Sequence, residues 1–188
     1  MIKEILKKRE IGTVKKQDIL ENQVNEVYLG LGSNLGNKIN NINKALYLIS
    51  DKNTRIVKIS SFYETLSWPK KSFPKYINIV IKIITNLSPS SLFIKLKKIE
   101  KDLGRLKNPK NYPRECDIDI LDFNQKKINL YVYDEKLLIP HPRMFNRLFV
   151  LLPLFEIAKN WKHPISRKKI DILITNLIDK DLTTIKLI

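Results

Sequence analysis

The sequence has only one cysteine, Cys116, which excludes an internal disulfide and a zinc site built from several cysteines. No histidine partner for Cys116 is evident in the sequence, so nothing in the pattern makes its thiol a catalytic nucleophile. We therefore expect Cys116 to have a structural role.

Long apolar stretches are also missing. No uncharged run approaches the roughly 20 residues that a membrane-spanning helix needs. The basic N-terminus lacks an apolar segment followed by a small-residue cleavage site, which a secretory signal would have. These absences predict a cytoplasmic protein with no membrane partner.

Acidic residues are few compared with basic ones. Only 19 Asp and Glu stand against 35 Lys and Arg, which gives a formal net charge of +16. Such an excess favours anionic ligands in general. The lysines are spread along nearly the whole chain, however, and there are only five glycines beside many Asn and Ile residues. The charge therefore fits a compositional bias better than a dedicated surface for nucleic acid, and we expect no nucleic-acid partner.

The chain is long enough for one domain with a sizeable core, since it has 188 residues and a hydrophobic content of 43%. Residues 1–26 are rich in Lys, Glu, Gln and Asn and carry no strong apolar stripe, so we predict a charged extension or linker there. The domain itself should span residues 27–188, and we expect it to act as a monomer.

Apolar periodicity and turn residues divide the domain into alternating elements. Asn37 is a suitable N-cap for the first helix, Pro89 suits the first turn of the second, and Gly104 suits its end. The predicted order is strand 27–31, helix to Ile49, strand 55–63, strand 76–85, helix 89–104 and strand 117–121. This order is typical of the ferredoxin-like α+β fold, an antiparallel sheet with helices packed on it.

The remainder of the chain should cover other parts of the sheet. Lys126–Tyr131 is the expected hairpin partner of the strand at 117–121, and Ile139–Arg143 is expected to be rigid and extended. A third helix is predicted over part of 146–158, where Pro153 should limit or kink it, and a short helix over 170–177.

The side chains best suited to catalysis lie in one stretch, where Asp117 and Asp119 are two residues apart on the predicted strand 117–121. Residues two apart on a strand share a face, so their carboxylates should lie side by side, roughly 6.5–7 Å apart, with Ile118 and Ile120 in the core. Hard oxygen ligands of this kind suit Mg²⁺, which is usually held by one or two carboxylates together with substrate phosphates. Several cations just upstream strengthen this interpretation; they are Arg105, Lys107, Lys110 and Arg114.

Several separated motifs agree with one family. From Val27 to about Pro164 the chain resembles the 6-hydroxymethyl-7,8-dihydropterin pyrophosphokinases of folate biosynthesis. The matching pieces are Gly32-Ser-Asn-Leu, Ser61-Phe-Tyr-Glu-Thr, Tyr76-Ile-Asn, the Glu100–Arg105 region, Pro113-Arg-x-x-Asp-Ile-Asp-Ile-Leu, Ile139-Pro-His-Pro-Arg-Met and Pro153-Leu-Phe-Glu-Ile-Ala. The resemblance implies transfer of an intact pyrophosphoryl group from ATP to a pterin alcohol, with two Mg²⁺ ions on the triphosphate and release of AMP.

The resemblance also implies roles for individual residues. It places the metal ligands at Asp117 and Asp119, with Asp119 as a candidate proton acceptor. The cations that bind phosphate and close the loops fall on Arg105, Lys107, Arg114, His141 and Arg147. The pterin would be lined or stacked by Tyr76 and Phe149, and its polar edge would be recognised by Thr65 and Asn78.

Two positions depart from the family pattern. Tyr112 precedes Pro113 where a small residue is usual, so Tyr112 is the expected aromatic of the loop 107–114, which we call the second loop. Trp68 stands where smaller apolar residues are common, in the loop 66–75. These two loops are predicted to close together over bound substrates.

Two other interpretations compete. A ferredoxin-like domain that binds nucleic acid would need aromatic residues clustered on its central strands and would have no need of an acid pair. Alternatively, the chain could be a fragment of a multifunctional folate enzyme, with residues 1–26 as the remnant of a linker.

Overall fold

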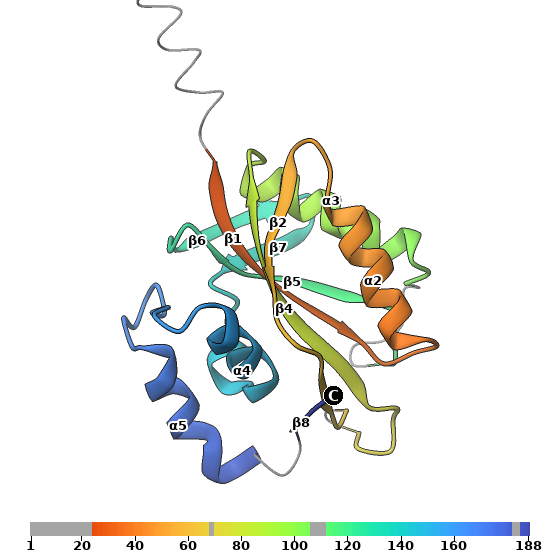
Figure 1. The fold of residues 1–188 in the computed structure, drawn as a ribbon. Helices are drawn as coiled ribbons and strands as arrows, with labels where there is room; N and C mark the ends of the chain where they lie inside the picture. Colours follow the sequence, from red (N-terminus) through yellow and green to blue (C-terminus); the bar gives the residue numbers. More distant parts are fainter. Residues whose placement is uncertain (1–23, 68–69, 106–111, 182–184) are drawn as a thin grey trace, which may run out of the picture.

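The computed structural model describes residues 24–67, 70–105, 112–181 and 185–188. Its main element is a six-stranded sheet in which β5 (Asp117–Phe123), β1 (Asn25–Ser33) and β4 (Tyr76–Thr85) lie side by side (Figure 1). The other edge of β4 pairs with β2 (Thr54–Ile59) and then with β3 (Tyr63–Thr65), and β8 (Ile185–Leu187) lies beyond β3. All of these pairings are antiparallel.

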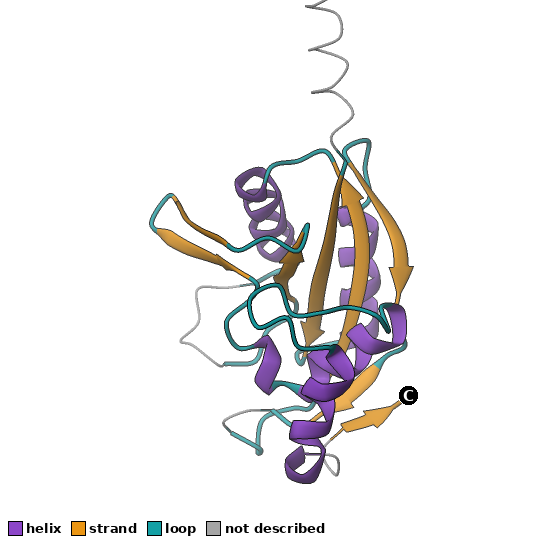
Figure 2. Cartoon of the chain, turned by 90° about the vertical axis from the view of Figure 1, so that its left-hand side faces the viewer, coloured by secondary structure: helices purple, strands orange, loops and turns teal. Residues whose placement is uncertain are grey.

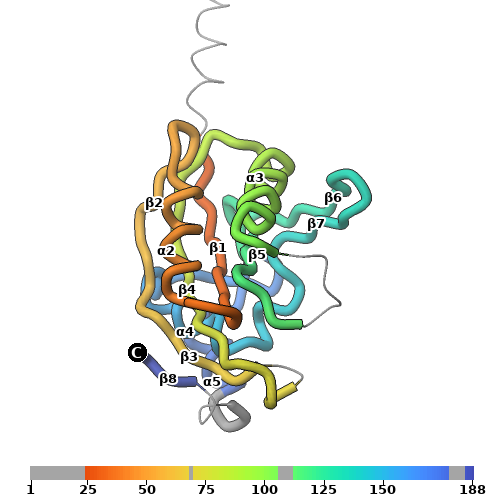
Figure 3. Tube along the Cα trace, turned by 90° about the vertical axis from the view of Figure 1, so that its right-hand side faces the viewer, coloured from red at the N-terminus to blue at the C-terminus, as the bar shows by residue number. Residues whose placement is uncertain are grey.

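Helices cover both faces of the sheet. On one face pack α2 (Lys38–Ile49) and α3 (Pro89–Asp102), which lie together in Figure 3. On the other face pack α4 (Leu148–Ile157) and α5 (Ile170–Asp181), preceded by the short 3₁₀ turn η1 (Met144–Asn146). The four main strands occur in the spatial order β5-β1-β4-β2, which is the ferredoxin-like order. The predicted α+β fold is therefore confirmed.

Alternation along β1 divides its side chains between two hydrophobic cores. Val27, Leu29 and Leu31 are buried in the core beneath α2 and α3. On the opposite face, Tyr28 is followed by Gly30 and Gly32. The α4 face of this central strand therefore has no side chain over its last two inward positions.

The predicted helix ends are mostly confirmed. The side chain of Asn37 accepts a hydrogen bond from the amide of Asn40 at 3.1 Å and caps α2. Pro89 begins α3, and Gly104 follows its end with a φ of +100°, a conformation that suits glycine. Ile39, in the first turn of α2, is 43% exposed, whereas Ile42, Ala45 and Ile49 of the same helix are buried.

The predicted strand 55–63 is interrupted, and Ser60 explains the break. Its amide donates to the carbonyl of Val80, and its hydroxyl accepts from the amide of Val80. β4 therefore continues straight while its neighbour divides into β2 and β3. β8 was not predicted, because a three-residue strand leaves almost no periodic signal.

The segment Lys126–Tyr131 is not the partner of β5, and that prediction was wrong. Asn124 and Gln125 both have positive φ values, and the tight turn they form directs the chain away from the sheet. β6 (Ile128–Val132) then pairs with β7 (Glu135–Ile139) as a separate hairpin, seen projecting in Figure 2. The segment after Ile139 was expected to be extended, yet it turns at once into η1.

The C-terminal end of α4 is fixed at three places. The ammonium of Lys58 donates to the carbonyl of Ile157, and Glu156 accepts hydrogen bonds from Ser61 and Tyr63. Just beyond the helix, the indole of Trp161 donates to the buried carboxylate of Asp122 at 2.7 Å. Pro153 does not end α4, which continues to Ile157.

Among the described residues, no helix has both the length and the apolar character needed to cross a membrane.

The loop after α4 is organised by His163. This ring is buried, and its Nδ1 accepts hydrogen bonds from the amides of Ile165 and Ser166. Burial lowers the pKa of His163 below its ordinary value of 6.5. The folded protein therefore keeps the ring neutral at a pH where the unfolded chain would bind a proton.

This burial predicts that acid destabilises the fold. The unfolded chain binds more protons than the folded one below pH 6.5, so the free energy of unfolding should fall there, by at most about 1.4 kcal/mol per pH unit for this group. His163→Asn retains an acceptor for the two amides but cannot titrate. Melting curves at pH 7.5 and 5.5 should show a smaller loss for the variant; an identical loss in both proteins would contradict the assignment.

Candidate active site on the α4 face of the sheet

Asp117 and Asp119 begin β5 and lie on the face that α4 covers in part. Ile118 and Ile120 are buried on the opposite face, as predicted. In the sheet register, Asp117 pairs with Gly32 and Asp119 pairs with Gly30. About a third of each carboxylate side chain is exposed, 30% for Asp117 and 36% for Asp119. The predicted acid pair is therefore partly open to solvent and lies beside the two glycines of β1.

Asp117 lies among cations. Arg105 donates to its carboxylate at 2.7 Å, and Arg114 approaches the same oxygen at 3.3 Å. Burial raises the pKa of Asp117, but the two guanidinium groups and Lys97 outweigh that effect, and the pKa falls below its ordinary value. Asp117 is therefore a carboxylate anion at neutral pH.

Glu100 on α3 holds the cations beside Asp117 in place. It is 2% exposed, and one of its oxygens accepts the amide of Ile118 at 2.7 Å, while Arg105 and Lys97 donate to the carboxylate. Burial raises the pKa of Glu100, and these cations offset part of that rise. Glu100 thus joins α3 to the start of β5 and fixes the guanidinium that faces Asp117.

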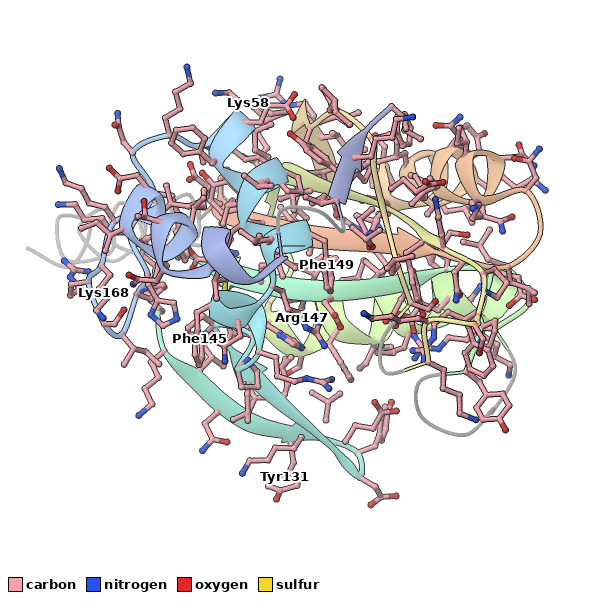
Figure 4. The ribbon with its side chains drawn as sticks, turned by 90° about the horizontal axis from the view of Figure 1, so that it is seen from below. Lys58, Tyr131, Phe145, Arg147, Phe149 and Lys168 are labelled. Carbon is pink, nitrogen blue, oxygen red and sulfur yellow. The ribbon has the colours of Figure 1, made fainter. Side chains whose placement is uncertain are left out.

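Asp119 is less constrained. The basic side chain beside it is His141, whose Nε2 lies 3.9 Å from the carboxylate. Burial lowers the pKa of His141, and the charge of Asp119 opposes that shift. Arg147, at the N-terminus of α4, stacks on the ring of Phe149 with 5.4 Å between the guanidinium carbon and the ring centroid. Figure 4 shows both side chains at this end of α4.

A polar pair occupies the other side of β1. Asn78 on β4 donates to the hydroxyl of Thr65 on β3 at 2.9 Å, and both side chains are buried. Asn78 pairs in register with Gly32, which pairs in turn with Asp117. Asp117, Gly32 and Asn78 therefore form one row across three strands, about 10 Å from end to end at ordinary strand spacing.

The glycine in this row has a specific geometric reason. A Cβ atom at Gly32 would lie 3.0 Å from the Oδ1 of Asn78 and 3.5 Å from the ring of Tyr76. A side chain there would have to displace the amide. At Gly30 the nearest atoms are those of the flexible Leu121 side chain, at 3.4 Å or more. Gly32 is buried and Gly30 is partly buried, and we call this stretch of β1, which has no side chain between the acid pair and Asn78, the glycine floor.

Asn34 connects the two loops that were predicted to close. Its Oδ1 accepts the amide of Arg114 at 2.8 Å, and its amide group donates to Ser67 and to the carbonyl of Pro74. Asn34 is 1% exposed, and all of these partners belong to one or the other loop.

The loops also meet through side chains. The ring centroids of Phe73 and Tyr112 are 5.6 Å apart, and the ammonium of Lys70 lies 5.2 and 5.8 Å from the two rings. Tyr112, the aromatic predicted for the second loop, therefore contacts Phe73 of the loop 66–75. Trp68 and Lys107 lie outside the described residues.

The structure brings most of the predicted site residues onto one face, with Phe149, in the first turn of α4, partly buried against the core on that face. Sequence reasoning missed the roles of Glu100, Asn34 and Gly32. A signal for Glu100 was available, since it follows the apolar residues Leu92, Leu96 and Ile99 and its neighbours place it on the buried side of α3. Cys116 is buried, and burial raises its pKa to about 12, so its thiol stays protonated, in agreement with a structural role.

Comparisons with known proteins agree with this geometry. The family model described as 7,8-dihydro-6-hydroxymethylpterin-pyrophosphokinase (HPPK) matches residues 28–159. The chain is 42% identical to the 2-amino-4-hydroxy-6-hydroxymethyldihydropteridine pyrophosphokinase of Aquifex aeolicus over 142 residues, which are 76% of this chain and 86% of that protein. It is 40% identical to the Haemophilus influenzae protein of the same name over 152 residues, which are 80% of this chain and 89% of that one.

Some relatives are much longer than this chain. The chain is 38% identical to the folic acid synthesis protein fol1 of Pneumocystis carinii over 90% of its own length but spans only 22% of that protein. The crystal structure of wild-type Plasmodium falciparum HPPK-DHPS with pterin and p-hydroxybenzoate matches with a TM-score of 0.70 and 16% identity, over 88% of this chain and 45% of that one. That likeness concerns the fold.

The family match covers the sheet, the acid pair and the residues around them, and the bacterial relatives match over nearly their whole length. The chain therefore belongs to the 7,8-dihydro-6-hydroxymethylpterin-pyrophosphokinase family, and it is an ATP-dependent diphosphotransferase that pyrophosphorylates hydroxymethyldihydropterin in folate synthesis.

Proposed function

We propose that Asp117 and Asp119 hold two Mg²⁺ ions on the triphosphate of ATP. Two carboxylates on one strand face are the hard oxygen donors that Mg²⁺ accepts, and the substrate phosphates supply further ligands. Bound there, the metal would neutralise charge on the phosphates during transfer. The partial exposure of both carboxylates supports the proposal, because a ligand from solvent can reach them.

The basic side chains around the acid pair bind the triphosphate in this proposal. Arg105 and Arg114 lie beside Asp117, and His141 lies beside Asp119. Arg147 would approach from the start of α4, and Lys107 from the second loop. Transfer of a phosphoryl-type group depends mainly on positioning and on stabilisation of charge, and fixed guanidinium groups supply both. Asp119 is the carboxylate available to accept the proton of the attacking hydroxyl.

The row formed by Asp117, Gly32 and Asn78 is the observation that carries the proposal. A flat pterin on the bare backbone of β1 would place its amide-like edge at Asn78 and Thr65, with Tyr76 and Phe149 lining it. Its hydroxymethyl group would then point toward Asp117 and the metal-bound phosphates, as attack on the β-phosphorus of ATP requires.

The protein is further proposed to act as a cytoplasmic monomer without nucleic-acid or membrane partners. A domain that stacks bases needs exposed aromatic rings on its central strands. The α4 face of β1 instead carries Gly30 and Gly32, beside two carboxylates that would repel a phosphate backbone.

Product analysis tests the reaction directly. The protein is incubated with ATP, Mg²⁺ and 6-hydroxymethyl-7,8-dihydropterin, and the nucleotide products are separated. AMP should appear in proportion to the pyrophosphorylated pterin. ADP as the nucleotide product would contradict transfer of an intact pyrophosphoryl group.

The metal assignment predicts that Asp119→Asn lowers kcat by about 100-fold or more, since a lost ligand removes several kcal/mol of transition-state stabilisation. Asp117→Asn should do the same, but Asp117 also pairs with Arg105 and Arg114, so Asp119 is the cleaner test. Melting temperature and AMP release are measured together, with the exposed Asp134→Asn as the matched control. Near-normal turnover of both site variants at saturating Mg²⁺ would refute the assignment.

The glycine floor predicts a selective defect in pterin binding. In Gly32→Ala the new methyl group must displace the Asn78 amide, so the KM for the pterin should rise by about tenfold while the Kd for ATP changes little. Gly30→Ala is the control, because its methyl group would meet only the flexible Leu121 side chain. Equal pterin kinetics in the two variants would exclude Gly32 as a determinant of the pterin site.

Coupled closure of the loops predicts a role for Tyr112. We expect the emission of Trp68 to change when a non-hydrolysable ATP analogue with Mg²⁺ binds and again when the pterin binds. Trp161 supports Asp122 and is best left in place, so the signal is taken as the difference between the wild type and Trp68→Phe. Tyr112→Ala should reduce the second change, whereas the exposed Tyr131→Ala should not. A Trp68 signal insensitive to both ligands, despite binding measured by calorimetry, would favour a preformed site.

A further inference from the structure

A groove of about 610 Å³ lies away from the acid pair, at the other end of α4. Figure 4 shows Lys58 at that end of α4 and Arg147 at the opposite end. Five cationic and two acidic side chains line the groove; they are Lys58, Lys82, Lys159, Lys162 and Arg167, with Glu26 and Glu156. We call this feature the basic groove.

Both acids of the basic groove are already engaged by other groups. Glu26 pairs with Lys82 at 2.6 Å and accepts the hydroxyl of Tyr28. Glu156 accepts hydrogen bonds from Ser61 and Tyr63 on the β2–β3 edge. Neither carboxylate is therefore available to neutralise the remaining cations.

Three cations of the groove have no such compensation. Lys159, Lys162 and Arg167 form no ion pair with an acidic side chain in the described part of the chain. Like charges gathered on one concave surface raise its electrostatic free energy and attract anions. The groove therefore gathers cations without acidic partners on one surface, whereas the other lysines are spread along the chain.

The loop that presents Arg167 is built rigidly. The amide of Arg167 donates to the carbonyl of His163 at 2.8 Å, and the amide of His163 donates to the carbonyl of Lys168 at 2.9 Å. Arg167 has a φ of +58°, which is unusual for a residue with a side chain and costs conformational free energy. The loop therefore holds the backbone of Arg167 in a defined conformation beside the groove.

We propose that the basic groove is a second anion site that binds an oligophosphate, either inorganic or as the triphosphate of a nucleotide. The volume suits a small ligand. Tyr28 and Trp161 also line the groove but are 6% and 5% exposed, so they offer no ring face on which bases could stack. The phosphates are therefore the recognised part, and a nucleic-acid strand lacks the stacking surface it would need.

Trp161 provides the reporter for a binding experiment. The full chain carrying Trp68→Phe has Trp161 as its single tryptophan, and it is titrated with inorganic tripolyphosphate and separately with ATP, both without Mg²⁺. Both ligands should change the emission of Trp161 to saturation with similar affinity. A response to ATP without one to tripolyphosphate, or no saturable response to either, would overturn the proposal.

Charge-removing variants locate the site. Adding Lys162→Gln and Arg167→Gly should weaken tripolyphosphate binding by about tenfold or more, because hydrogen bonds to charged groups are lost. Glycine suits the positive φ at position 167, so folding should be preserved. The matched control removes two exposed lysines elsewhere, Lys44→Gln with Lys52→Gln.

The control pair and an Arg114→Ala variant should both keep the wild-type affinity of the groove, and AMP release should persist in the Lys162→Gln/Arg167→Gly protein. Equal weakening in the control pair would reduce the effect to diffuse attraction and refute the site. Loss of the Trp161 signal in Arg114→Ala would instead assign it to the catalytic face and refute it as well.

Discussion

Charge compensation among three neighbouring carboxylates is the constraint on which the catalytic face depends. Glu100, Asp117 and Asp119 meet where α3 approaches the start of β5, and two of the three are held by the same guanidinium, that of Arg105. Without cations, repulsion between the acids would raise their pKa values and neutralise them. The fold supplies Lys97, Arg105 and Arg114 from α3 and the following loop, so Asp117 stays ionised. Glu100 is the buried anchor of this network, because it also binds the β5 backbone through Ile118.

The arrangement of the sheet then sets the distance between the two halves of the reaction. β1 lies between the strand that carries the acids and the strand that carries Asn78. A side chain at position 32 would stand between them and displace Asn78, so glycine at this position preserves the row. Sheet geometry cannot vary by more than a fraction of the strand spacing, and it fixes the row formed by Asp117, Gly32 and Asn78 more firmly than any loop could.

Much of the fold and the placement of the acid pair could be predicted from the sequence, because these features follow from local periodicity. The strand at 76–85, the caps of α2 and α3 and the common face of Asp117 and Asp119 all arise from neighbouring residues. The failures depend on tertiary contacts or backbone conformations. The hairpin β6–β7 leaves the sheet because of positive φ at Asn124 and Gln125, and β2 ends where Ser60 bonds to Val80. The bridging role of Asn34 depends on two loops far apart in the chain, and no spacing rule could reveal it.

A contact between β5 and the segment after α4 helps to position the catalytic residues although loops surround them. Asp122 lies on the same strand as Asp117 and Asp119, and a bulge in the β1–β5 register after Tyr28 places it toward α4. There it accepts the indole of Trp161, which fixes the segment after α4 to the strand that carries the acids. Arg147 begins α4, so its position is set by a rigid helix whose far end is tied to that strand. Arg147 and the two carboxylates are thus linked through α4 and β5, and this link does not pass through the two loops.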